Sequence, residues 1–179
     1  MIQKFEEVLD DGWNCFLLGD PYTLLKFKKD NNLPDNLQTA FTTTEAGDNV
    51  VREGAVIYFF NLKEPYDVGF TVYFSYMDKS IFEESNISPT HSVQGYIAEV
   101  ISGKISLYNW SSLYNYTEQM AEQSVEFRNI ELPNGRYQID VKVGYINDDP
   151  TIEFLIKDTE HQNVQVDLNS FISYDFELS

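Results

Sequence analysis

Residues 124–146 read SVEFRNIELPNGRYQIDVKVGYI and carry the clearest strand pattern in the chain. From Tyr137 to Tyr145 apolar and polar residues alternate, which is typical of a strand with one buried and one solvated face. Upstream, the alternation changes phase near Arg128, as a β-bulge would cause. Pro133-Asn134-Gly135 between the two runs favours a turn. The stretch therefore predicts a β-hairpin formed by Ser124–Leu132 and Arg136–Ile146.

Shorter apolar runs predict further strands at residues 13–18, 22–28, 55–60, 70–76, 152–156, 164–168 and 171–178. The first two would pair across Gly19-Asp20-Pro21, and residues 152–156 would pair with residues 164–168. Helix signals are few. Residues 2–9 are compatible with one short turn, and Tyr116–Gln123 with a second helix that has Thr117 as its N-cap.

Two polar stretches do not show a core pattern. Pro34–Asn49 is rich in Thr, Asn and Gln and indicates a long loop or a weak edge strand, and Asp78–Gly95 indicates a loop insertion between sheets. No repeat or linker divides the chain. The sequence thus predicts an all-β protein, a single β-sandwich domain over residues 1–179 with mostly antiparallel strands and little helix.

The formal net charge is −17, from 29 acidic against 12 basic residues. Such a surface repels nucleic acid and anionic lipid and attracts basic partners, so we expect no nucleic-acid and no membrane binding. The acidic C-terminal strand region, residues 147–179, could place several carboxylates on one sheet face. These carboxylates either steer a basic protein partner or serve only to keep the protein soluble.

Composition and the N-terminal residues indicate a cytoplasmic protein. The chain is 42% hydrophobic, which is enough for a core, and Cys15 is its single cysteine. One cysteine cannot form an internal disulfide, and its apolar setting favours a buried thiol. Acidic residues occupy the first positions where an export signal would need an apolar run. No stretch approaches the ~18 apolar residues of a membrane helix.

Four aromatic residues lie close together in sequence, among Ser and Asn. Tyr and Trp with small polar neighbours form rigid anchors in protein interfaces, although alternating rings can equally fill the core positions of one strand. We take the aromatic cluster and three acids downstream as the candidate partner-binding residues. They are Tyr108, Trp110, Tyr114, Tyr116, Asp148, Asp149 and Glu153.

Catalytic and metal-binding patterns are weak. His91 and His161 stand without a motif, and the surroundings of Cys15 are unlike those of a reactive thiol. The sequence therefore predicts no enzyme, no cofactor and no resident metal. Asn147-Asp148-Asp149, with Asp158 or Glu160, could offer oxygen ligands to Ca²⁺, but the same residues are an ordinary turn sequence.

The run from Val125 to Ile139, with its Leu-Pro-x-Gly-x-Tyr turn, resembles the C-terminal half of the competence protein J family. Val68–Phe74 and Ala55–Phe60 are similar to its upstream strands, so the resemblance covers residues 50–146. The Asp78–Gly95 insertion and the acidic C-terminal extension depart from the family pattern. Members of that family include inhibitors of a nuclease. The resemblance implies an inhibitor or immunity protein and assigns no binding residue.

The sequence thus predicts an acidic cytoplasmic binding protein, an immunity protein or antitoxin that blocks a basic, nuclease-type toxin by covering its active site. Two alternatives stay open. The aromatic residues could instead form a stacking platform of a carbohydrate- or small-ligand-binding module, which a concave aromatic groove would favour. Long exposed strand edges would favour a structural subunit of a bacterial assembly.

Overall fold

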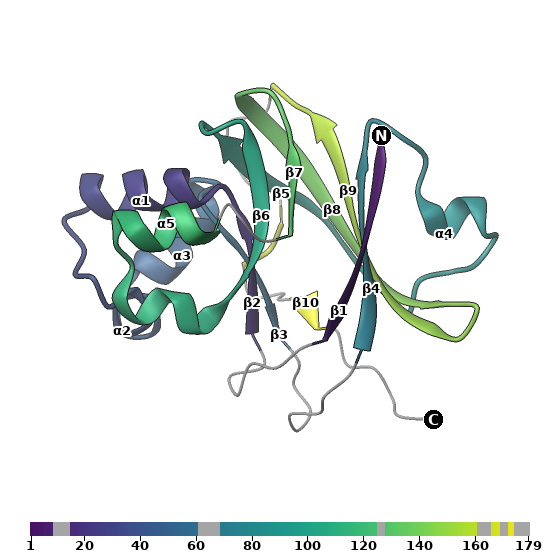
Figure 1. Ribbon diagram of the computed structural model, residues 1–179, viewed down its shortest axis with the longest axis horizontal. Helices are drawn as coiled ribbons and strands as arrows, with labels where there is room; N and C mark the ends of the chain where they lie inside the picture. Colours follow the sequence, from purple (N-terminus) through teal and green to yellow (C-terminus); the bar gives the residue numbers. More distant parts are fainter. Residues whose placement is uncertain (9–14, 61–68, 125–127, 161–165, 169–171, 174–179) are drawn as a thin grey trace.

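The computed structural model describes residues 1–8, 15–60, 69–124, 128–160, 166–168 and 172–173. Within these residues, two five-stranded sheets face each other, and a layer of helices covers the outer face of one of them (Figure 1). In the order of hydrogen-bonded neighbours, sheet A contains β1 (Ile2–Val8), β4 (Gly69–Tyr76), β9 (Asp149–Asp158), β8 (Gly135–Ile146) and β5 (His91–Val100). Sheet B contains β10 (Ile172–Ser173), β3 (Ile57–Phe60), β2 (Cys15–Gly19), β6 (Lys104–Asn109) and β7 (Asn129–Glu131).

Aromatic side chains join the two sheets. Phe59 on β3 lies 5.1 Å from Phe154 on β9 between ring centroids, and Phe16 on β2 lies 6.1 Å from Phe70 on β4. Most strand pairs are antiparallel, but β4 runs parallel to β9 and β10 runs parallel to β3. Part of the hydrophobic core therefore lies between the two facing sheets.

The prediction of an all-β protein with little helix is wrong, because the structure is mixed α/β. The outer face of sheet B is covered by α1 (Pro21–Asp30), α2 (Leu37–Thr43), α3 (Ala46–Arg52), the 3₁₀ helix η1 (Trp110–Asn115) and α5 (Glu118–Ser124). A short helix, α4 (Ile81–Glu84), lies on the other side of the molecule (Figure 1). Aromatic contacts hold this helical layer against sheet B: Tyr58 of β3 packs against Phe41 of α2 and Trp110 of η1.

The segment predicted as a strand at residues 22–28 is helix α1. Its N-cap is Asp20, whose carboxylate accepts a hydrogen bond of 2.8 Å from the amide of Tyr22, and Pro21 opens the helix. An acidic cap followed by Pro at the first helical position is a helix-start signal, here mistaken for a hairpin turn. Likewise, the stretch predicted as a loop or edge strand, Pro34–Asn49, contains α2 and most of α3, with Asn36 capping α2.

The hairpin predicted for Ser124–Leu132 and Arg136–Ile146 is also wrong. Strand β7 pairs with β6 in sheet B, whereas β8 pairs with β5 and β9 in sheet A. The chain crosses between sheets at Pro133, where the hydroxyl of Tyr137 donates to the Pro133 carbonyl at 2.6 Å. The true hairpin is β8–β9, whose turn residues Asn147 and Asp148 have φ of 52° and 67°. Positive φ at both central positions is typical of a type I′ turn.

Other sequence predictions are confirmed or corrected in part. Strands at 13–18, 55–60, 70–76 and 152–156 correspond to β2, β3, β4 and β9, and the helix at 116–123 corresponds to α5. Of the helical turn predicted at 2–9, the described residues 2–8 form strand β1 instead, and the insertion at 78–95 holds α4 and the start of β5. The predicted strands at 164–168 and 171–178 lie mostly outside the described residues. That the chain is a single domain stays a prediction.

Candidate functional site

Three of the four candidate aromatic residues are buried. Tyr116 is fully buried, and its hydroxyl donates to the carbonyl of Pro21 at 2.8 Å. Tyr108 and Trp110 are buried between sheet B and the helices, where Trp110 packs edge-on against Tyr58. Burial raises the pKa of Tyr108 and of Tyr116. Only Tyr114, with 67% of its surface exposed, is in a position to contact a partner directly.

The three candidate acids differ in burial. Glu153 on β9 is fully buried, and its carboxylate accepts hydrogen bonds from the hydroxyls of Ser75 and Ser80 and from the amide of Ile81. These hydrogen bonds connect α4 to sheet A, and the buried Glu153 carboxylate does not face a partner. Asp148 and Asp149 are exposed at the β8–β9 turn.

The exposed candidates do not form one site. Tyr114 belongs to η1 in the helical layer, whereas the β8–β9 turn lies at the opposite side of the molecule, beyond sheet A (Figure 1). Partner contacts at Tyr114, Asp148 and Asp149 stay predictions, and they concern two separate surfaces.

A recess that the sequence reading missed lies at the upper end of sheet A in Figure 1, where β4 and β9 end and β8 begins. We call it the tyrosine recess. Its volume is about 400 Å³, and it is lined by Tyr76, Pro133, Asn134, Gly135, Arg136, Tyr137, Asp158, Thr159 and Glu160. The rings of Tyr76 and Tyr137 meet nearly edge to face, with centroids 5.8 Å apart. Tyr76 donates its hydroxyl proton to the Asp158 carboxylate at 3.0 Å.

The recess is built to hold neutral phenols beside carboxylates. Burial raises the pKa of Tyr137 to about 12, and the neighbouring Tyr76 and Asp158 add to the rise. The pKa of Tyr76 is raised by burial and by its hydrogen bond to Asp158. Asp158 and Glu160 carry negative charge against the single guanidinium of Arg136. A cation entering the recess would therefore meet aromatic rings and carboxylates together, the two groups that bind Lys and Arg side chains.

Exposed apolar residues border the same end of sheet A. Met77 is 62% exposed and Met1 is 54% exposed, although large apolar side chains usually avoid solvent. The two are neighbours, because the backbone amide of Tyr76 donates to the Met1 carbonyl at 2.8 Å. Met77 itself has a φ of 51°, an uncommon conformation for a residue with a side chain. Exposed apolar side chains bordered by polar and charged groups are a usual feature of a protein-binding surface.

The recess joins the ends of three strands that are far apart in sequence, which explains why the pattern of residues did not reveal it. Tyr76 ends β4, Tyr137 lies near the start of β8 and Asp158 ends β9. Tyr137 and Asp158 face each other in the β8–β9 ladder. The one feature of the sequence that could have indicated the recess is an aromatic residue at a strand end, and this feature is too common to identify a site.

The remaining chemical groups are unremarkable in their surroundings. Cys15 is buried on β2, His91 is exposed at the start of β5, and His161 lies outside the described residues. In the described part of the chain no three His, Cys, Asp or Glu side chains gather closely enough to hold a metal ion. The helices described here are all too short or too polar to cross a membrane.

Fold and surface together define a two-sheet α/β protein with an acidic, tyrosine-lined recess at one end. No family model and no curated protein matches the chain. Among solved structures, the crystal structure of ComJ from Bacillus subtilis, inhibitor of the DNA degrading activity of NucA, is similar to it. The match has 13% identity and a TM-score of 0.47, and covers 89% of this chain and 99% of ComJ. The resemblance to the competence protein J family, predicted from residues 50–146, is confirmed to this extent.

Proposed function

We propose that this chain is an inhibitor or immunity protein that binds a basic nuclease and covers its active site. In this proposal a Lys or Arg of the nuclease enters the tyrosine recess. Nuclease sites are rich in Lys and Arg because they hold phosphates. An inhibitor that offers carboxylates in their place competes with the nucleic acid for those groups.

The observation that carries the proposal is the pairing of rings and carboxylates in the recess. Tyr76 supplies a partly exposed ring that packs edge to face against the buried ring of Tyr137, and Asp158 keeps a second carboxylate oxygen beyond the one that Tyr76 engages. Met1 and Met77 lie exposed beside them. Buried cation–aromatic contacts surrounded by apolar groups are the usual centre of a tight interface.

The distribution of charge supports a basic partner. Most described lysines and arginines already have an acidic partner: Lys4, Lys26, Lys28, Arg52, Lys142 and Lys157. Exposed acids without any salt bridge in the described part of the chain include Glu84, Glu118, Glu122, Asp148 and Asp149. The unbalanced carboxylates give a negative field that attracts a basic protein from a distance.

Steering and contact would be carried by different residues. At about 3.3 Å per residue, the strand from Tyr137 to the turn at Asp148 spans on the order of 36 Å. A standard interface buries about 800 Å² on each partner, a patch with a radius of about 16 Å, so an interface centred on the recess does not reach the β8–β9 turn. We therefore assign contact to the recess and long-range attraction to Asp148 and Asp149.

The test begins with affinity capture from the native cell lysate at low salt, using the wild-type chain and the Asp158→Asn variant in parallel. The retained protein is then assayed for DNA degradation with increasing amounts of the purified chain. We expect a basic nuclease that is retained by the wild type, lost from the variant, and fully inhibited near one-to-one stoichiometry.

Two results would contradict the proposal. The first is a retained protein that has no nuclease activity. The second is a nuclease that binds but cleaves DNA at an unchanged rate when saturated, because covering of the active site would then be excluded. Equal retention by wild type and Asp158→Asn would reject the recess as the contact while leaving inhibition intact.

A further inference from the structure

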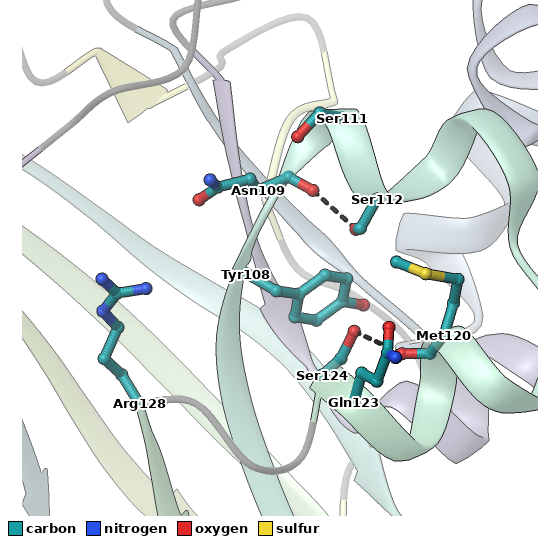
Figure 2. A pocket seen from close by; sticks show the side chains of 8 residues that line it. All are labelled: Tyr108, Asn109, Ser111, Ser112, Met120, Gln123, Ser124 and Arg128. Atoms are coloured by element: carbon teal, nitrogen blue, oxygen red, sulfur yellow. Dashed lines mark hydrogen bonds between the residues drawn. The ribbon is translucent and has the colours of Figure 1, made fainter.

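A second recess lies beside sheet B and the helical layer, and it shares no lining residue with the tyrosine recess. It opens between the end of β6, the start of η1 and the end of α5, and has a volume of about 350 Å³. This is within the range of about 300–1,000 Å³ that small-molecule sites occupy. Its lining residues are Tyr108, Asn109, Ser111, Ser112, Met120, Gln123, Ser124 and Arg128 (Figure 2).

The buried Tyr108 hydroxyl makes no hydrogen bond of normal length within the described residues, although the Tyr116 side chain lies close enough to influence its pKa. The residue is 4% exposed, and Figure 2 shows its ring reaching from β6 toward Met120, Gln123 and Ser124. The nearby Tyr116 hydroxyl is engaged with the Pro21 carbonyl. A buried hydroxyl without a partner costs about 1–3 kcal/mol, so the fold carries a polar group that is suited to an additional donor or acceptor.

The lining is polar and almost uncharged. Hydroxyls and side-chain amides dominate, Met120 supplies an apolar wall, and Arg128 is the single charged side chain. Three other recesses contain carboxylates: Asp158 and Glu160 in one, Asp48 in the second and Glu131 in the third. In a chain with a net charge of −17, a recess lined without acids is unusual.

Some of the lining groups already have partners, and this limits which atoms remain for a ligand. Ser112 donates to the backbone carbonyl of Asn109 at 2.7 Å, and Ser124 donates to the carbonyl of Met120 at 2.8 Å. Both hydroxyls keep their acceptor lone pairs. Gln123 is exposed, and neither the oxygen nor the nitrogen of its side-chain amide makes a hydrogen bond within the described residues. The recess thus offers the Tyr108 hydroxyl, the Gln123 amide and hydroxyl acceptors.

We propose that this recess binds a neutral, hydroxyl-rich small molecule of monosaccharide size, with the Tyr108 hydroxyl and the Gln123 amide as its main hydrogen-bonding groups. Neutral hydroxyls match these donors and acceptors, and Arg128, the single charged group of the lining, already interacts within the protein, so the recess does not require an anionic ligand. Met120 would pack against the apolar face of the ring. The site is separate from the tyrosine recess and does not depend on the nuclease proposal.

The test is a titration of the ¹⁵N-labelled chain with D-glucose, D-galactose and N-acetyl-D-glucosamine, followed by NMR. Glucuronate and glucosamine serve as the anionic and cationic counterparts. We expect saturable binding of at least one neutral sugar, with a dissociation constant of about 1 mM or tighter. The shifts should centre on the side-chain amides of Gln123 and Asn109, and the charged sugars should bind at least tenfold more weakly.

Matched variants distinguish this site from weak binding elsewhere. Gln123→Ala should weaken the sugar about tenfold, whereas Gln119→Ala on the same helix, outside the lining, should not. Tyr108→Phe should abolish most of the affinity while leaving the unliganded melting temperature unchanged or raised, because it removes an unpaired hydroxyl.

The proposal is overturned if no neutral sugar binds, if glucuronate binds more tightly than glucose, or if Gln123→Ala and Gln119→Ala behave alike. A clear drop in the melting temperature of unliganded Tyr108→Phe would also overturn it, since the hydroxyl would then already be engaged.

Discussion

The Ser80 hydroxyl donates a hydrogen bond of 2.5 Å to the Glu153 carboxylate across 73 positions of sequence. Ser80 precedes α4, and the amide of Ile81 donates to the same carboxylate at 2.9 Å. The carboxylate on β9 therefore caps a helix that belongs to a distant loop. This bond places Glu153 inside the protein, although its position in an acidic region suggested a surface role.

Removal of the Glu153 side chain should destabilise the fold. In Glu153→Ala the hydroxyls of Ser75 and Ser80 and the amide of Ile81 lose their acceptor in a buried place. We expect the free energy of unfolding to fall by about 3 kcal/mol or more. Urea denaturation measures the change, and Glu84→Ala, at an exposed acid of α4, should stay within about 0.5 kcal/mol of wild type. Equal stability of the two variants would show that the network contributes nothing.

Asp20 should be equally important for the helical layer. Its buried carboxylate accepts from the amides of Tyr22, Ile101 and Ser102 at 2.8, 2.6 and 2.7 Å, and from the Ser102 hydroxyl at 2.8 Å. Asp20→Ala removes both the N-cap of α1 and its tie to the β5–β6 connection. We expect a loss of about 3 kcal/mol by urea denaturation. Asp30→Ala, which removes an exposed partner of Lys26, should cost less than about 1 kcal/mol.

At the β8–β9 turn, the effect of charge on stability can be distinguished from the effect of backbone strain. Asp148 has a φ of 67°, which glycine adopts more easily, whereas Asp149 begins strand β9. Asp148→Gly should stabilise the protein by about 0.5 kcal/mol, and Asp149→Gly should destabilise it by about 0.5–1 kcal/mol. Both substitutions remove one negative charge, so thermal denaturation separates the backbone effect. The same shift in both would mean that electrostatic repulsion dominates at this turn.

Alkaline pH should destabilise the protein through its buried tyrosines. Burial raises the pKa of Tyr96 to about 12, as it does for Tyr137. The folded pKa lies above the value of about 10 in the unfolded chain, so the folded state binds these protons more tightly. Their contribution to stability is fully present below about pH 10 and is lost as the pH rises to about 12. Denaturation midpoints measured between pH 9 and pH 12, with phenolate absorbance, test this; a flat profile would refute it.

Association with a basic partner should depend on salt and on the position of the removed acid. Exposed charges are screened beyond about 8 Å at physiological ionic strength, so the association rate should fall markedly as salt rises. Asp148→Asn should slow association without changing dissociation, whereas Asp158→Asn should speed dissociation. Surface plasmon resonance against the captured nuclease gives both rates. An association rate that is independent of salt would exclude steering.

Much of the strand pattern could be predicted from the sequence, but pairing could not. The alternation from Tyr137 to Tyr145 identified β8 correctly, yet its partners are β5 and β9 and not the strand before Pro133. Period-two alternation reports only that one face is buried; it does not report which strand lies alongside. For helix α1 the type of element was predicted wrongly. The Asp-Pro cap was visible in the sequence, but a short apolar run fits a strand as well as a helix.

The candidate site shows the same division. Sequence alone determined the net charge, the abundance of tyrosine and the local turn at Asn147–Asp148, because these depend only on composition and neighbouring residues. The tertiary structure decided which acids are exposed and which are buried, and it brought Tyr76, Tyr137 and Asp158 together. That arrangement depends on how three strands align in sheet A, through contacts between residues far apart in the chain.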